Sequence, residues 1–190
     1  MSESRAVRFW KSFSSEAADI SEWLAAGHLR KAFDRVEALL LERGFDFCFD
    51  LSRDGPTAIL ILTPEGDQGV AAEIDELLAV APMVPGWRLV GRRQRKGIAD
   101  AITIVHQIYG VDVTGVSFDV AQSSSGLSVV MFSHALEGMS QEVARGLAQT
   151  FLDHAIGESL VMERITVIET SASGAGHRSA ESLVEALESH

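Results

Sequence analysis

Residues 45–63 read FDFCFDLSRDGPTAILILT, and this stretch decides the fold of the first half of the chain. Phenylalanines alternate with small or polar residues from Phe45 to Phe49, which is the period of a half-buried β-strand. Glycine and proline favour turns, so residues 52–56 (SRDGP) predict a turn. The apolar run at 57–63 has the length of a second strand, and the whole stretch therefore predicts a β-hairpin.

Amphipathic helices are predicted on both sides of this hairpin. An apolar stripe with spacings of four, three and four predicts a helix over about residues 28–42: Leu29, Phe33, Val36 and Leu40. A similar stripe predicts a helix over 68–81, which ends where Pro82 and Pro85 bar its continuation. Residues 86–94 then predict a third strand.

The second half of the chain repeats this order of elements. It predicts a helix at 98–110, strands at 116–121 and 127–133, a helix that begins after Ser140, and a last strand at 160–170. The triplet at 49–51 also aligns with the triplet at 118–120, and Gly55 aligns with Gly126. We interpret this agreement as an ancient duplication.

The predicted fold class is α+β. It consists of two tandem α-β-β-α-β units, related to the ferredoxin-like fold, with antiparallel sheets and with helices packed on one face. Whether the two units form one sheet or two is left open. The predicted domains are an N-terminal docking segment and short helix at 1–27, a first repeat at 28–94, a second repeat at 95–170, and a hinge with a C-terminal helix at 171–190.

Composition narrows the class of protein. The chain has 190 residues and a net charge of −11, which argues against general binding of nucleic acid because that binding needs a basic face. No apolar run reaches the roughly 18 residues of a membrane-spanning helix, and no secretory signal is visible at the N-terminus. The single cysteine, Cys48, allows no internal disulfide. We therefore expect a soluble cytoplasmic protein.

Two aromatic motifs in the first half resemble a family of bacterial proteins of unknown function. Members of that family open with FWxxF, here Phe9, Trp10 and Phe13, and carry an APxxPGW element, here residues 81–87, before a strand with a basic end. The likeness covers residues 7–96, and some members are similar to regulators of ribonuclease E. The resemblance implies a bacterial origin and a small α+β fold, and it supplies no catalytic residues.

No complete catalytic or cofactor motif is found in the sequence. Phosphate-binding glycine loops, paired cysteines with metal-ligand spacing and nucleophile motifs are all missing, so no catalytic residue, cofactor or metal site is predicted. His134 and Glu137, at a strand end, could bind a metal or move a proton, but no third group is identifiable. Asp50 and Asp119 occupy equivalent positions of the two repeats and are candidate polar groups of a cleft, but solvent-facing strand positions are the preferred explanation.

A basic stretch is the sharpest local feature. Five of the sixteen lysines and arginines fall within nine positions, and Trp87 precedes them. A solvated strand end explains the stretch, whereas a binding surface for an acidic protein or an RNA backbone is the functional alternative. RNA is disfavoured because Trp87 is the nearest aromatic residue. The candidate binding residues are Trp87, Arg88, Arg92, Arg93, Arg95, Lys96, His134 and Glu137.

These observations favour a non-catalytic protein-interaction or regulatory module whose partner is another protein. The alternative is a small enzyme or ligand-binding protein that uses a cleft between the two repeats. Neither nucleic acid nor a membrane is expected as a partner, and a homodimer is left open. The first repeat, which alone has the proline-glycine-tryptophan element and the basic strand end, is where we expect a partner to bind.

Overall fold

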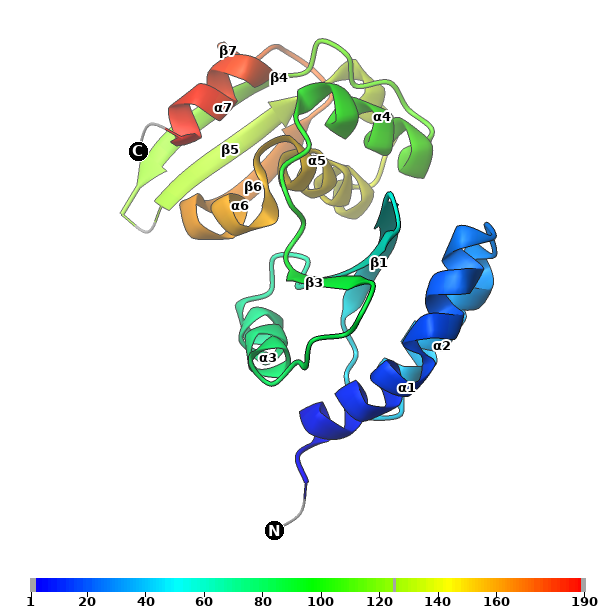
Figure 1. The fold of residues 1–190 in the computed structure, drawn as a ribbon. Coiled ribbons are helices and arrows are strands. Elements are labelled where there is room, and N and C mark those ends of the chain that lie inside the picture. The colour runs from blue at the N-terminus through cyan, green and yellow to red at the C-terminus, as the bar shows by residue number, and fades with distance from the viewer. Residues whose placement is uncertain (1–2, 125, 189–190) are drawn as a thin grey trace. The chain divides into compact units, whose positions relative to one another are not determined.

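The computed structural model describes residues 3–124 and 126–188 of the chain (Figure 1). The chain divides into two compact units, residues 1–92 and 93–190, and each unit is described by itself. The division falls between Arg92 and Arg93, inside the stretch that the sequence predicts as a basic strand end.

The first unit has three helices and a three-stranded sheet among its described residues. Its elements are α1 (Arg5–Ala25), α2 (Leu29–Leu41), β1 (Cys48–Asp54), β2 (Thr57–Thr63), α3 (Gln68–Ala79) and β3 (Trp87–Gly91). The strand order in the sheet is β1-β2-β3. The predicted hairpin is present as β1 and β2, but its first strand is displaced along the chain. β1 begins at Cys48 and not at Phe45, and it continues to Asp54 through most of the turn predicted at 52–56.

The second unit has a four-stranded sheet with strand order β6-β5-β4-β7. Its elements are α4 (Ile98–Tyr109), β4 (Ser117–Ser123), β5 (Gly126–Phe132), the short 3₁₀ helix η1 (His134–Leu136), α5 (Gln141–Ile156), α6 (Glu158–Arg164), β6 (Ile165–Ser171), β7 (Arg178–Ser179) and α7 (Ala180–Glu188). The chain is thus a mixed α and β protein with two small sheets.

Both sheets are mixed, and the expectation of purely antiparallel sheets was wrong. β1 pairs with β2 antiparallel and β4 pairs with β5 antiparallel, as hairpins must. β3 lies parallel to β2, and β6 lies parallel to β5. Each of these third strands follows a helical crossover, and a crossover returns the chain in the same direction beside the strand that it left.

The two hairpins have the same length and the same register. Each strand has seven residues, and Asp50 and Asp119 are both the third residue of the first strand. Asp50 lies opposite Ile61, and Asp119 lies opposite Val130, which is the equivalent residue of the second hairpin. The alignment of 49–51 with 118–120 therefore matches the strand pairing. The alignment of Gly55 with Gly126 was wrong, because Gly126 is the first residue of β5 and is equivalent to Thr57, the first residue of β2.

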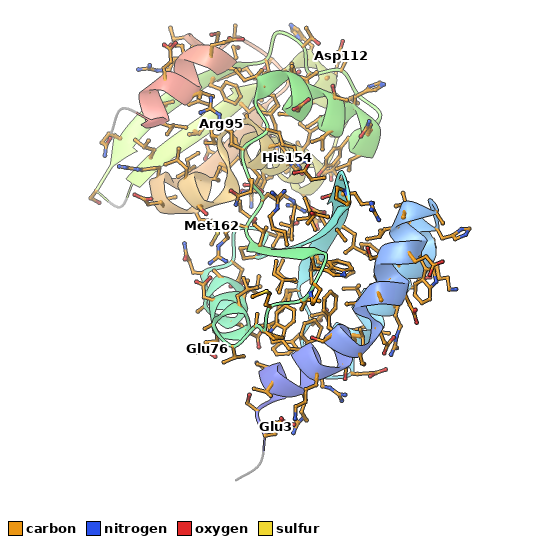
Figure 2. All side chains as sticks on the ribbon, in the orientation of Figure 1. Glu3, Glu76, Arg95, Asp112, His154 and Met162 are labelled. Carbon is orange, nitrogen blue, oxygen red and sulfur yellow. The ribbon has the colours of Figure 1, made fainter. Side chains whose placement is uncertain are left out.

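Helices pack on one face of the first sheet. Fully buried residues of α1, α2 and α3 form one core with alternating residues of β2: Ala58, Leu60 and Leu62. α1 is a single helix of 21 residues, so the predicted docking segment and short helix are continuous. Figure 2 shows the aromatic side chains that fill the space between this helix and the sheet.

The second unit is built in the same manner. Residues of α4, α5, α6 and α7 share a core with Phe118, Val129 and Met131, which lie on one face of the four-stranded sheet. The buried residues of α7 include Leu183 and Leu187, which confirms the predicted C-terminal helix.

Two predicted segments differ in the second unit. Residues 160–164 were predicted as strand, but they belong to α6, and the strand begins only at Ile165. Gly157, with a φ of 94°, ends α5 and lets α6 start at once, so Val161 and Ile165 are both buried one turn apart. The predicted hinge at 171–176 is a connection fixed by hydrogen bonds, described below.

No helix among residues 3–124 and 126–188 is long and apolar enough to cross a membrane.

Candidate functional site

The aromatic motifs of the first unit form its core. Phe9 and Phe13 are fully buried and Trp10 nearly so, and the ring of Phe13 meets the ring of Trp87 edge-on at 5.0 Å between centroids. The indole N–H of Trp10 donates to the carbonyl of Leu77 at 2.7 Å, and that of Trp87 donates to the carbonyl of Ala17 at 2.9 Å. The two motifs thus pack on each other and hold α1 against the rest of the unit.

The basic stretch is divided between different neighbours. Arg88, on β3, lies 3.7 Å from the carboxylate of Asp54 and is exposed. Arg92, with a φ of 134°, turns its guanidinium toward α3, where it donates to Asp75 at 3.1 Å and to the carbonyl of Ala71. Arg88 and Arg92 therefore bond to different parts of the first unit, and β3 ends before Arg92.

The remaining basic residues belong to the second unit, where the segment 93–97 lies against the junction of α5 and α6. Arg93 and Glu158 bond reciprocally: the N–H of Arg93 donates to the Glu158 carboxylate at 2.9 Å, and the N–H of Glu158 donates to the carbonyl of Arg93 at 3.0 Å. The N–H groups of Lys96 and Gly97 both donate to the carbonyl of His154. Figure 2 labels Arg95 on this segment and His154 on α5.

Charged groups are buried at this junction. Asp153 and Glu158 have no exposed surface, and Arg93 lies 3.7 Å from the carboxylate of Asp153. The side-chain amide of Gln149 donates to Asp153 at 2.8 Å. Because each buried carboxylate has a hydrogen-bond donor beside it, the junction is built as an internal anchor for the start of the unit. Arg95 and Lys96 remain exposed on its surface.

His134 and Glu137 lie at opposite ends of η1, and both side chains are exposed. The N–H of Glu137 donates to the carbonyl of His134, which closes the turn of this short helix. Among the described residues, no group of three or more histidine, cysteine, aspartate or glutamate side chains is placed to hold a metal ion.

Asp119 has a partner that the sequence does not predict. The backbone N–H and the ring Nδ1 of His177 both lie within hydrogen-bond distance of one carboxylate oxygen of Asp119, at 2.8 and 2.7 Å. These two contacts, the backbone one first, hold the pKa of the Asp119 carboxyl below its ordinary value. Gly176 donates to the hydroxyl of Ser117 at 2.8 Å, so the segment 171–177 is tied across the start of β4.

An exposed apolar site of the first unit lies at the start of α2. Leu29 shares one helix face with Val36 and Leu40, two and three turns further on, and both of those are buried. Leu29 is nevertheless 61% exposed, and Phe33 is 37% exposed. The apolar stripe of α2 therefore continues beyond the part that its own unit covers.

Aromatic and basic side chains surround this exposed end. The ring of Phe33 stacks on that of Phe49, with centroids 4.3 Å apart, and the ammonium of Lys31 lies 4.0 Å from the centroid of Trp23. A depression of about 510 Å³ is lined by residues 27–31. We call Leu29, Phe33 and the depression the α2 patch.

Local sequence explains the turn that positions the patch between α1 and α2. The N–H groups of Gly27 and His28 donate to the carbonyls of Leu24 and Trp23, which is the pattern of a glycine-ended helix, and Gly27 has a φ of 78°. Arg35 of α2 forms a paired ion bridge with Glu16 of α1, and this hydrogen bonding lowers the pKa of Glu16. The turn at Gly27 and the Arg35–Glu16 ion pair thus hold α1 and α2 together.

The sequence predicts Leu29 and Phe33 as buried stripe residues, so it misses the α2 patch. A local signal does exist, because Leu29 is embedded among three basic or titratable residues: His28, Arg30 and Lys31. A helix start with that composition is more typical of a surface than of a core.

Comparison of the chain with protein-family models, with curated proteins and with solved structures finds no match.

Proposed function

We propose that the chain is a non-catalytic protein-interaction or regulatory module, and that its first unit binds a protein partner at the α2 patch. The observation that carries the proposal is the exposed end of the α2 stripe, since a leucine left 61% exposed in line with buried residues offers apolar area for a second molecule. Phe33, one turn further along α2, is partly exposed and stacks on Phe49, and partly exposed aromatic residues are typical of the anchor sites of interfaces.

The charges around the patch indicate the chemistry of the partner. Arg30 and Lys31 are exposed beside the depression, in a chain whose net charge is −11. The first N–H groups of α2 add partial positive charge, because His28 makes no side-chain cap. A partner segment that combines apolar side chains with carboxylates complements this surface.

The distribution of exposed apolar residues also favours the first unit. Of the eight large apolar residues that are exposed in the described chain, five lie in the first unit: Leu29, Phe33, Leu41, Val80 and Met83. Three of these five are on α2, so the partner contact is expected on that helix.

A photo-crosslinking amino acid at position 33 tests this proposal in lysate of the native host. We expect it to capture a defined protein, and we expect Leu29→Asp to abolish that capture. Aspartate is favourable in the first turn of a helix, so the substitution keeps α2 intact while it opposes an acidic partner. An unchanged urea midpoint of the variant confirms that the fold is kept.

The second unit supplies a matched control. Ile108 is 62% exposed, nearly the same as Leu29, and lies on α4. A crosslinker at position 108 should not capture the same protein, and Ile108→Asp should leave the capture at position 33 unchanged. If both positions capture the same set of proteins, or if Leu29→Asp has no effect, the α2 patch is not the binding site.

We also propose that the two units descend from one duplicated α-β-β-α-β unit related to the ferredoxin-like fold. The equal length and register of the two hairpins, each followed by a crossover to a parallel third strand, support this proposal. We retain the expectations that the protein is cytoplasmic and of bacterial origin, which the high net charge and the aromatic motifs support.

A further inference from the structure

The outer edge of β6 differs from the other open sheet edges of the described chain. β6 has one strand neighbour, β5, so its other side presents unpaired backbone N–H and carbonyl groups. The strand has seven residues with the sequence ITVIETS, in which Glu169 is the one charged residue. Val167, at 45% exposure, adds apolar surface to this edge.

The remaining edges carry features that oppose pairing with another strand. β1 contains Asp50, Arg53 and Asp54, and charged residues on an edge oppose such pairing. β3 has five residues, one of them Arg88. β7 pairs with the start of β4. The unpaired part of the β4 edge begins at Asp119, which is bonded to His177. β6 has one such feature, a register shift at Thr166, but among the described edge strands it alone combines seven residues, several β-branched residues and a single charge.

We propose that β6 pairs antiparallel with β6 of a second copy of this chain, which joins two four-stranded sheets into one. A two-fold axis through Ile168, the midpoint of the strand, centres the pairing on the regular part of β6, which follows the register shift at Thr166. This register places Ile168 opposite Ile168 of the other copy, and pairs of β-branched residues are favourable across strands. It also places Val167 opposite Glu169 of the other copy.

The position of Glu169 favours this register and favours a second copy of the chain as the pairing partner. A shift of the axis to Glu169 would place the two glutamates directly opposite each other, which is unfavourable. With the axis at Ile168 no like charges are opposed, so the strand is complementary to itself. This inference concerns the second unit and does not depend on the α2 patch.

The full-length chain tests the pairing through its mass in solution as a function of concentration. We expect a monomer–dimer equilibrium. Val167→Glu should raise the dimer dissociation constant about 2- to 30-fold, because two glutamate pairs then face each other across the axis. Val167→Lys should leave the dimer as strong as before or strengthen it, since lysine then faces Glu169. Val143→Glu, at a position on α5 that is 46% exposed, is the control and should have no effect.

Disulfide formation tests the register directly in a Cys48→Ser background, since Cys48 is the one native cysteine. A mixture of Val167→Cys chains with Glu169→Cys chains should crosslink on oxidation, because opposed Cβ atoms in a sheet are within disulfide reach. Each variant alone should crosslink weakly, because its cysteines are then diagonal. A chain that stays monomeric at all concentrations, a dimer that Val167→Glu leaves unchanged, or a dimer that Val167→Lys weakens equally would overturn the proposal.

Discussion

Replacing Phe13 with alanine tests whether the first aromatic motif is core or binding surface. The Phe13 ring has no exposed surface, and three aromatic rings lie within 6 Å of its centroid: Phe9 at 5.9 Å, Trp10 at 5.7 Å and Trp87 at 5.0 Å. Large-to-small changes of a buried phenylalanine cost about 3–5 kcal/mol, the sum of lost transfer free energy and the cavity left behind. We therefore expect Phe13→Ala to lower the free energy of unfolding of the first unit by about 4 kcal/mol.

Tryptophan fluorescence during urea unfolding is a suitable assay. All three tryptophans, Trp10, Trp23 and Trp87, lie in the first unit, so their emission reports on that unit alone. With a urea m-value of about 1–3 kcal/mol/M, the expected loss lowers the unfolding midpoint by more than about 1 M. Phe33→Ala is the control, because its ring is 37% exposed and packs on one other ring, and it should cost about 1 kcal/mol. Equal shifts for the two variants would refute the assignment of Phe13 to the core.

Three further predictions concern the second unit. In a circular-dichroism melt, Glu158→Ala should destabilise the second unit by about 1–3 kcal/mol, because the N–H of Arg93 loses its carboxylate acceptor. Glu163 is exposed, so Glu163→Ala should be neutral in the same melt. Gly176→Ala should lower the stability of the second unit by about 1–3 kcal/mol, since a Cβ there would lie 2.4 Å from the backbone of Phe118. A variant that melts at the same temperature as the native chain would contradict this close approach. The folded-state pKa of Asp119 lies below its unfolded value, so its contribution to stability is present above the unfolded pKa and is lost as pH falls through the folded pKa. Carboxyl-carbon NMR titration should show this low pKa in the native chain. In His177→Ala the pKa should rise but stay below its ordinary value, because the backbone N–H of residue 177 still donates to Asp119.

Periodicity predicts most of the fold because each element buries one face. The apolar run at 57–63 and the stripe of Val36 and Leu40 each predict an element that the structure contains, whereas the alternation at 45–49 predicts a strand that begins only at Cys48. Aromatic spacing also predicts that Phe9, Trp10 and Phe13 dock onto the body, and all three are buried. These predictions succeed because burial acts on residues that are close in sequence.

Long-range geometry explains what the sequence does not predict. The direction of β3 and β6 depends on the crossover that precedes each strand, and no local pattern reports it. The start of α6 at Glu158 depends on hydrogen bonds to Arg93, which is 65 residues earlier. The basic stretch is one continuous feature of the sequence. Its members bond to groups on α3, on β1 and at the start of α6, because each residue bonds to the acceptor that lies nearest to it in the fold.

The two units have equivalent hairpins but differ in the helix before the hairpin and in the third strand. The helix before the first hairpin, α2, exposes Leu29 and Phe33, whereas the helix before the second, α4, exposes Ile108 alone among its large apolar residues in the described chain. The third strand of the first unit has five residues and Arg88, whereas that of the second has seven residues and a free edge. If one ancestral unit was duplicated, the first copy diverged at its leading helix and the second at its last strand. Since neither change touches the register of a hairpin, binding of a partner by α2 and pairing through β6 can be altered independently, and variants at Leu29 and Val167 should affect one association each.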